Sequence, residues 1–260
     1  MNDTNSLKQT FNEVALLYNE VRPRYPEALF STIFDITQIK TNAKLLEIGA
    51  GTGQATKPLA QKGFQITAIE PGPSLTQVAK SELHAYKNVQ IENTSFEEAE
   101  FSPNTFDLVY AATSFHWIDP AVKYTKTHRL LRDNGYLAVI HTNHISDEKG
   151  DKFFTESLPI YDRYNFLDNP NPKLPNKKDL KPDDIDEHFF KLIHYQLFPL
   201  ITTYTGKNFV KLLNTYSNHL NAAKKTQQLF YQAIEDFINN DYHGEIEKHF
   251  AMSLMIAQKV

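Results

Sequence analysis

The sequence predicts an α/β fold in which a doubly wound, mostly parallel sheet is covered by helices. Two observations predict it. Short apolar runs typical of buried strands alternate with helical patterns from residue 44 to residue 141, and this alternation favours parallel strands joined by crossover helices. A glycine-rich turn follows the first strand, at the place where an open sheet of this kind binds a nucleotide-like ligand.

The length and composition fit one large domain. The chain has 260 residues, of which 41% are hydrophobic, and a net charge of −4. It has no apolar run of about 20 residues, as a membrane span requires, and its polar N-terminus lacks a signal peptide's apolar segment. We therefore expect a cytoplasmic protein with no membrane partner. The absence of cysteine excludes disulfides and thiolate sites, and the lack of a basic stripe argues against a nucleic-acid partner.

The remaining elements follow in order along the chain. Residues 7–34 predict two helices with a break at 22–26, because a residue before proline leaves the helical region and Pro26 can open the second helix. An aromatic helix bent at Pro159 is expected over 150–168. Apolar runs bounded by turn residues predict strands over 65–70, 89–93, 106–112, 136–141, 189–198 and 250–256. Apolar residues at helical spacing predict helices over 75–84, 121–132, 206–220 and 222–239.

The stretch 44–56 is the centre of the functional prediction. It is Lys-Leu-Leu-Glu-Ile-Gly-Ala-Gly-Thr-Gly-Gln-Ala-Thr, and it predicts a buried strand over 45–48, a tight turn and a helix over 52–62. Glycine tolerates positive φ and has no Cβ, so a ligand can approach its backbone closely. Free N–H groups at the start of the helix would add to the binding site.

The spacing of these glycines argues against a dinucleotide site. In a Gly-x-Gly-x-x-Gly pattern the third glycine would fall on Gln54 or Thr56. The pattern present is Glu-x-Gly-x-Gly-x-Gly, starting at Glu47. Glu70 closes the next predicted strand, and a carboxylate there can accept both hydroxyls of a ribose. The residues therefore indicate an adenosine-containing ligand, although a glycine-rich turn without a ligand remains the structural alternative.

Together with Glu70, this pattern resembles the S-adenosylmethionine (SAM) motif of class I methyltransferases with a type 11 domain. The resemblance implies a Rossmann-like, seven-stranded sheet whose last strand is antiparallel, and SAM as cofactor with S-adenosylhomocysteine (SAH) as product. It places Glu47, Gly49, Gly51 and Gly53 around the methionine end, Glu70 on the ribose, and Ser95 and Phe96 near the adenine. The expected cofactor-binding set is completed by Ala50, Pro71 and Ala111. For the 94–98 segment, a helix start capped by Thr94 is the structural alternative.

Two further segments resemble the group that includes trans-aconitate methyltransferase. One is the strand 106–112 followed by Phe-His-Trp-Ile-Asp at 115–119, and the other is 204–217, which resembles the C-terminal part of that group. Residues 11–29 resemble the N-terminal lid of small-molecule SAM methyltransferases, which folds over the cofactor. The resemblance implies a small-molecule acceptor. It implies catalytic roles for Tyr18, Arg22 and His116, and substrate-binding roles for Tyr25, Trp117 and His141. For each residue, packing or solvated charge is the structural alternative.

The acceptor's chemistry decides which of these residues would act. A carboxylate acceptor is already ionised near pH 7 and needs no base, so Arg22 would bind it as a fork. A hydroxyl or amine acceptor requires a base, and His116 or His141 is the natural candidate. A non-catalytic SAM- or SAH-binding protein and an NAD-dependent oxidoreductase are the alternative functions. No ligand spacing indicates a metal site, since His141-x-x-His144 alone is a weak signal.

We expect a single methyltransferase domain over 1–260, as a monomer or homodimer. Its expected parts are a helical lid at 1–40, a cofactor-binding core at 41–142, an insertion at 143–187 and a C-terminal half at 188–260. Within the insertion, residues 169–182 contain four prolines and are too long for an ordinary connection, which indicates a functional or mobile segment. The lysines there fit a solvated loop better than an anion site.

Overall fold

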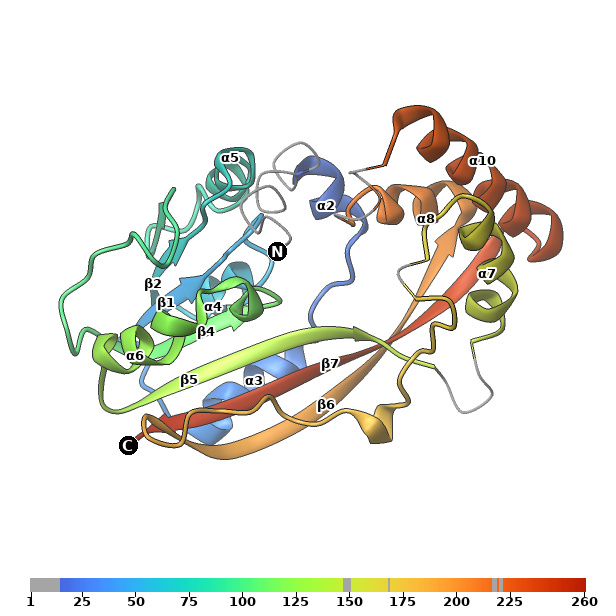
Figure 1. Ribbon diagram of the computed structural model, residues 1–260. Coiled ribbons are helices and arrows are strands. Elements are labelled where there is room, and N and C mark those ends of the chain that lie inside the picture. The colour runs from blue at the N-terminus through green and yellow to red at the C-terminus, as the bar shows by residue number, and fades with distance from the viewer. Residues whose placement is uncertain (1–14, 147–150, 168, 217–218, 220–221) are drawn as a thin grey trace.

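A single seven-stranded sheet organises the molecule (Figure 1). The computed structural model describes residues 15–146, 151–167, 169–216, 219 and 222–260. The strands are β1 (Lys44–Ile48), β2 (Gln65–Ile69), β3 (Val89–Glu92), β4 (Phe106–Ala112), β5 (Leu131–His144), β6 (Phe190–Thr205) and β7 (Glu245–Lys259). Their order is β3-β2-β1-β4-β5-β7-β6, in which β1 to β5 are parallel and β7 is antiparallel to both of its neighbours. The predicted fold class is confirmed, including the antiparallel last strand.

Helices cover the sheet and extend beyond one end of it. They are α2 (Ala15–Val21), α3 (Glu27–Thr37), α4 (Thr56–Gln61), α5 (Pro73–Glu82), α6 (Pro120–Leu130), α7 (Lys152–Arg163), α8 (Gly206–Leu213) and α10 (Lys224–Asp241), with short 3₁₀ turns η1 (Phe115–Trp117) and η2 (Lys177–Asp179). The break at 22–26 is confirmed, and the part of the predicted first helix before residue 15 lies outside the described residues. Among the described helices, none is both long and apolar enough to cross a membrane.

The main differences from the sequence prediction lie in the glycine turn and the last strands. The helix predicted over 52–62 begins at Thr56, because Gly51 and Gly53 have φ of +58° and +85°, which a right-handed helix cannot include. Strands β5, β6 and β7 are all longer than predicted. Pairing between β6 and β7 runs from Phe190↔Lys259 to Thr205↔Glu245, and this long-range pairing, rather than local alternation, sets their length.

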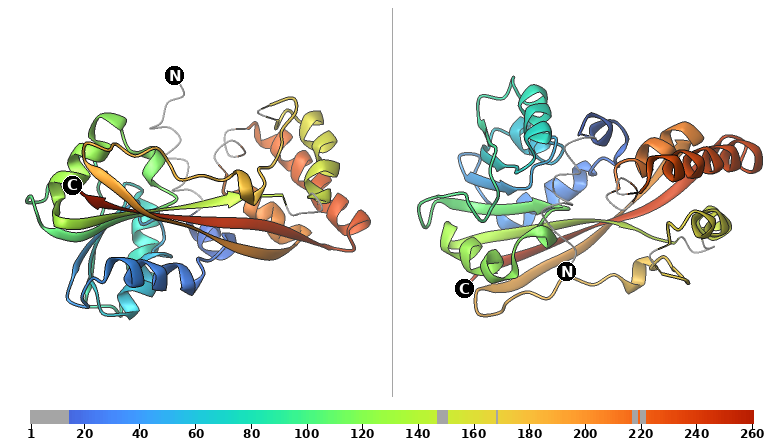
Figure 2. Two further views of the ribbon diagram at one scale, coloured as in Figure 1. Left: turned by 90° about the horizontal axis from the view of Figure 1, so that it is seen from below. Right: turned by 45° about the horizontal axis from the view of Figure 1, so that its top comes forward.

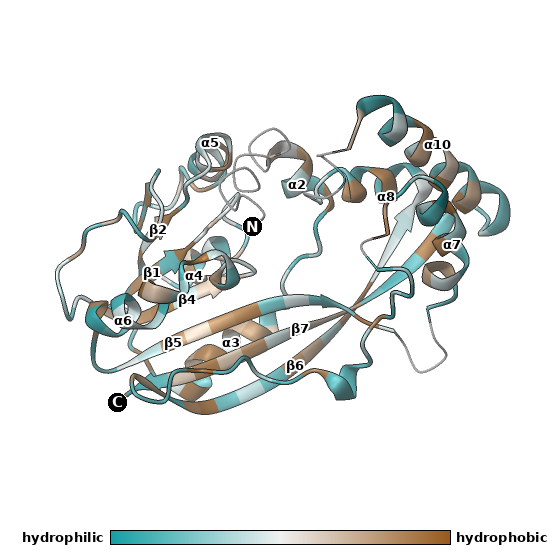
Figure 3. Cartoon of the chain, in the orientation of Figure 1, coloured by the Kyte–Doolittle hydropathy of each residue, from teal (hydrophilic) through white to brown (hydrophobic). Residues whose placement is uncertain are grey.

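Helices lie on both faces of the sheet, as the left view of Figure 2 shows from below, and an apolar cluster fills the space on each face. Successive strand residues point to opposite faces. Leu45 of β1 therefore packs in a cluster with α3 and α4, while Leu46 packs on the other face with α6. Because both faces are buried, the central parts of the parallel strands are continuously apolar rather than alternating, as the brown colour in the middle of β5 in Figure 3 illustrates.

A third cluster lies where β6 and β7 extend beyond the other strands (Figure 1). Here α7, α8 and α10 pack around Phe230, which is fully buried. The α7 end of this cluster is fixed by Asp151, whose side chain caps the helix through the Phe154 N–H and lies 3.2 Å from the buried Lys248 Nζ. Val21 of α2 joins the same cluster. The N-terminal segment therefore links the sheet's ligand-binding end to the C-terminal helices.

Glu47 joins three elements inside the core. Its side chain on β1 is buried, and Oε2 accepts hydrogen bonds from Thr56 Oγ1 of α4 at 2.6 Å and from the Tyr110 hydroxyl of β4 at 2.7 Å. Burial raises the pKa of Glu47 to about 7, although the two hydroxyl donors oppose this shift. The carboxyl therefore holds α4 and β4 against β1 and changes its charge near neutral pH.

The raised pKa predicts a pH-dependent stability that Glu47→Gln removes. A carboxyl with a raised folded-state pKa stabilises the fold at low pH, and this contribution is lost as pH rises through the folded-state pKa. Between pH 5 and pH 8, denaturant unfolding should therefore show wild type losing about 2–3 kcal/mol of stability relative to the variant. The exposed Glu100→Gln serves as the control and should follow wild type. Parallel pH curves for wild type and Glu47→Gln would contradict the assignment.

Candidate functional site

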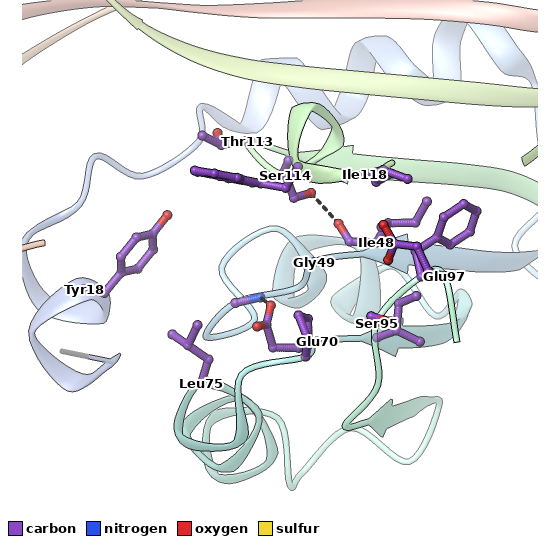
Figure 4. Close-up of a pocket in the computed structure, with 16 residues that line it drawn as sticks. Tyr18, Ile48, Gly49, Glu70, Leu75, Ser95, Glu97, Thr113, Ser114 and Ile118 are labelled. Atoms are coloured by element: carbon purple, nitrogen blue, oxygen red, sulfur yellow. Dashed lines mark hydrogen bonds between the residues drawn. The ribbon is translucent and has the colours of Figure 1, made fainter. Parts of the chain in front are cut away.

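A pocket opens at the carboxyl ends of β1, β2 and β4, beside the glycine turn (Figure 4). It encloses about 810 Å³ of space, part of it open to solvent, which suits a small molecule or a nucleotide-sized cofactor, whose sites span roughly 300–1,000 Å³. In Figure 4, Tyr18 lies at one end and Ser95 and Glu97 at the other, with Glu70 and Ser114 on opposite walls. Of the predicted site residues, the pocket brings together Tyr18, Gly49, Gly51, Glu70, Pro71, Ser95, Phe96 and Trp117.

The three glycines of the turn are required for different reasons. The Gly49 N–H donates to the Ile69 carbonyl at 2.9 Å, which fixes the turn to the end of β2. A Cβ on Gly49 would lie 2.5 Å from Ser114 Cβ, and one on Gly53 would lie 2.7 Å from a Leu83 methyl carbon. A Cβ on Gly51 would meet no protein atom within 4 Å. Gly49 and Gly53 are therefore needed for packing, whereas Gly51 leaves open a space that a ligand can use.

Glu70 is held at the floor of the pocket by backbone groups. Its Oε2 accepts the Gly51 N–H at 2.9 Å, and its Oε1 accepts the Gly72 N–H at 2.8 Å. Burial raises the pKa of Glu70, and the two N–H groups oppose that shift. Each carboxylate oxygen can accept more than one hydrogen bond. The same carboxylate can therefore shape the glycine turn and accept hydroxyl groups of a ligand.

The far end of the pocket is formed by Ser95 and Phe96, as the sequence predicts. Ser95 Oγ accepts the Glu98 N–H at 3.2 Å. The residue that caps this segment is therefore Ser95, and the segment is a turn rather than the helix start at Thr94 that was the structural alternative. Phe96 is buried and gives this end of the pocket an apolar surface.

Sequence reasoning missed the wall formed by Thr113 and Ser114. Thr113 has φ of +60°, an uncommon conformation for a β-branched residue, and its N–H donates to the Ile140 carbonyl at 2.7 Å. Its Oγ1 lies 3.2 Å from the Tyr25 hydroxyl and 3.3 Å from Thr142 Oγ1. The position of both residues, directly after strand 106–112, was the available signal, because ligands bind at the carboxyl ends of such strands.

Other residues that sequence reasoning missed are apolar. They are Ile48 and Ile69 at the strand ends, Leu75 of α5, Ala112 and Ile118. Their apolar character gave no functional signal, because the same pattern also describes the core.

Several predicted cofactor residues lie outside the pocket's lining. Glu47 is bonded within the core, Ala50 and Ala111 are buried, and Gly53 faces Leu83. Their predicted contacts with a cofactor stay predictions. In the structure, Glu47 bonds within the core, Ala50 and Gly53 belong to the turn itself, and Ala111 is buried on β4.

The predicted histidines lie beside the pocket. The His116 ring is 5.0 Å from the Trp117 ring and 6.1 Å from the His141 ring, centre to centre. His141 Nε2 lies 2.7 Å from Asp183 Oδ2. His144 instead bonds Asp151, so the His141-x-x-His144 pair does not converge. Among the described residues, no group of three ligating side chains could hold a metal ion.

Arg22 joins α2 to α8 instead of pointing into the pocket. Its guanidinium lies 4.8 Å from the centre of the Tyr18 ring and 4.4 Å from that of Tyr216. Nε donates to Thr215 Oγ1 at 2.8 Å, and Nη2 donates to the Thr215 carbonyl at 2.9 Å. These bonds use the donors that a carboxylate fork would need. Binding of an acceptor carboxylate by Arg22 stays a prediction that requires this contact to open.

Comparison with known proteins agrees with this geometry. Residues 46–139 match the family model described as a methyltransferase domain. A relative from Mycobacterium tuberculosis, named as an uncharacterised methyltransferase, is 29% identical over 131 residues, which cover 50% of this chain and 51% of that protein. The chain thus spans about half the length of the first curated relatives it matches.

Solved structures share the fold. A protein from Anaeromyxobacter dehalogenans, provisionally assigned as a type II methyltransferase, has a TM-score of 0.60 at 17% identity, covering 90% of this chain and 97% of that one. The [4+2]-cyclase SpnF has a TM-score of 0.52 at 15% identity, covering 92% and 83%. The chain therefore has the fold of class I methyltransferases, and residues 46–139 carry the match to the methyltransferase-domain family.

Proposed function

We propose that the protein is a SAM-dependent methyltransferase that acts on a small-molecule acceptor. The observation that carries the proposal is the pairing of Gly51 with Glu70 in the pocket. The backbone at Gly51 is open to a ligand, and the Glu70 carboxylate beside it can accept hydroxyl groups. The match of residues 46–139 to a methyltransferase domain supports the same cofactor.

The residues present fit SAM. Gly49 and Gly51 would border its methionine end, Glu70 would accept its ribose hydroxyls, and Ser95 and Phe96 would enclose its adenine. SAM supplies an electrophilic methyl group on a positively charged sulfur. The protein's part is to align the acceptor with that methyl group and to exclude water, which can account for several kcal/mol of rate acceleration.

The position of α2 supports a small acceptor. This helix contacts both α5 and α8, and its Tyr18 lines the pocket, so it covers an opening that a macromolecule would need to enter. The narrower resemblance to the trans-aconitate methyltransferase group belongs to this proposal as a likeness of chain segments and leaves the acceptor's chemistry open. A cytoplasmic location also belongs to the proposal.

The direct test is incubation of the purified protein with SAM and small acceptors, with SAH formation measured by chromatography. A methyltransferase forms SAH in proportion to a methylated product. SAM binding without turnover would favour the non-catalytic alternative, and the cyclase SpnF shows that this fold also occurs in a protein named for another reaction. Binding of reduced nicotinamide cofactor in place of SAM would favour the oxidoreductase.

Gly51→Val should abolish detectable SAM binding. The valine side chain would fill the space that no protein atom occupies around Gly51, and calorimetric titration should show an affinity at least about 100-fold weaker, equivalent to about 2.7 kcal/mol. Gly63→Val is a matched control, because Gly63 also has positive φ and open surroundings but lies outside the pocket. Both positions have positive φ, so each variant adds backbone strain. Equal SAM affinity in the two would contradict the pocket assignment.

Glu70→Ala should weaken SAM binding by about 1–3 kcal/mol, through loss of hydrogen bonds to a charged group. The measurement is the SAM dissociation constant at pH 8. Glu70→Gln keeps one acceptor oxygen and should lie between Glu70→Ala and wild type. The exposed Glu100→Ala is the control and should bind as wild type does. An unchanged affinity in Glu70→Ala would mean that the ribose does not bind at Glu70.

A further inference from the structure

We propose that the methylated atom of the acceptor carries a proton, as in an alcohol, phenol or amine, and that His141 removes this proton while Asp183 positions the histidine ring. The inference rests on the proposed methyl transfer and adds to it the acceptor class, the base and a role for the insertion. Asp183 is the positioning residue in this arrangement.

The bond between His141 and Asp183 sets which ring nitrogen can act. His141 Nε2 lies 2.7 Å from Asp183 Oδ2. In a neutral histidine facing a carboxylate, this nitrogen carries the hydrogen, and the other nitrogen, Nδ1, has the free lone pair. Among the described residues, Nδ1 of His141 makes no hydrogen bond. The carboxylate therefore leaves Nδ1 ready to accept a proton and would stabilise the imidazolium that forms.

The histidine lies against the pocket wall. Thr113 lines the pocket, and its N–H donates to the carbonyl of Ile140, the residue before His141. The ring of His116 lies 6.1 Å from that of His141 and 5.0 Å from that of Trp117, which also lines the pocket. His141 thus stands beside the wall that an acceptor would contact.

The chain around Asp183 contacts two separate elements. The Asp183 carboxylate bonds His141 of β5, and the carbonyl of the next residue, Asp184, accepts the Tyr124 hydroxyl of α6 at 2.8 Å. These contacts fix the end of the insertion over the carboxyl edge of the sheet. The insertion therefore places the Asp183 carboxylate beside His141.

The surrounding charges favour this arrangement. The hydrogen bond from His141 lowers the pKa of Asp183; burial opposes this shift, and positive charge on His141, Lys123 or His116 adds to it. Asp183 is therefore ionised at neutral pH, whether or not His141 carries a charge. Burial lowers the pKa of His116, and His141 and Lys123 add to the effect. His116 is therefore neutral near pH 7 and adds no positive charge to the wall.

The titratable groups that interact with Asp183 are His141 of β5, His116 of η1, Lys123 and Tyr124 of α6, and Tyr195 of β6. Asp184 and Asp186 follow it in the insertion and act with it on Tyr124.

The acceptor class follows from what an Asp–His pair can do. A carboxylate acceptor has no proton to remove, and it would meet the negative charge of Asp183. A protic acceptor can take the methyl group and lose its proton to His141 in one step. Its oxygen or nitrogen forms a bond to the methyl carbon, the methyl–sulfur electron pair stays on sulfur, and the acceptor's proton passes to Nδ1 of His141. Such a base contributes about 10²–10⁴-fold to a rate.

The first test reads the histidine tautomer without activity. Protein with ¹⁵N-labelled histidine, saturated with SAH, is examined by NMR at pH 8, and the His141 signal is assigned by its loss in His141→Gln. We expect the Nε2–H tautomer in wild type and a mixed or Nδ1–H tautomer in Asp183→Asn. Asp184→Asn is the matched control and should keep the wild-type signal. An Nδ1–H tautomer in wild type, or no change in Asp183→Asn, would overturn the pairing.

The second test compares two acceptor sets, one of small alcohols, phenols and amines and one of small carboxylates. SAH should form with the protic set. Asp183→Asn and His141→Gln should each lower kcat about 100-fold with KM for SAM unchanged, and Asp184→Asn should keep wild-type kcat.

Turnover with the carboxylates alone, turnover with neither set, or full activity in His141→Gln would overturn the inference. SAM affinity is measured in parallel by calorimetry. If the wild-type protein does not bind SAM, the proposed function is wrong. If it binds SAM and gives any of these outcomes, only the inference about His141 and Asp183 is wrong.

Discussion

The hydrogen bond from the Gly51 N–H to the Glu70 carboxylate is the contact on which the ligand-binding end depends. It ties the turn after β1 to the end of β2, and the second Glu70 oxygen fixes the start of α5 through Gly72. One buried side chain therefore sets the course of two loops. Because the carboxylate is oriented before any ligand arrives, little ordering cost remains when a ligand binds.

Glu47 supports the same region from inside the core. Its bonds to Thr56 and Tyr110 hold α4 and β4 against β1, so the two acidic residues of the sequence pattern have separate structural roles. The sequence pattern alone could not separate them. Both carboxyls lie near strand ends, and the difference lies in their partners. Glu47 accepts from the side chains of Thr56 and Tyr110 in the core, whereas Glu70 accepts from the backbone of Gly51 and Gly72 beside the pocket.

The part of the pocket beside the glycine turn was predictable because its signals are local. A buried strand, three glycines and an acidic residue at the next strand end all lie within 44–70, and each carries its own physical meaning. The contacts of Arg22 and His141 were not predictable in the same way. Arg22 meets Thr215 across 193 positions of the sequence, and His141 meets Asp183 across 42. Neither pairing leaves a periodic pattern in the sequence. The full lengths of β6 and β7 are likewise set by a long-range contact, because the two strands pair with each other.

The proposed function requires that the pocket beside Gly51 and Glu70 binds SAM. The most direct measurement is calorimetric titration of the wild-type protein with SAM, SAH and NADH in parallel. We expect micromolar binding of SAM and SAH, one molecule per chain, and no binding of NADH. Binding of NADH, or binding of none of the three, would contradict the proposed function.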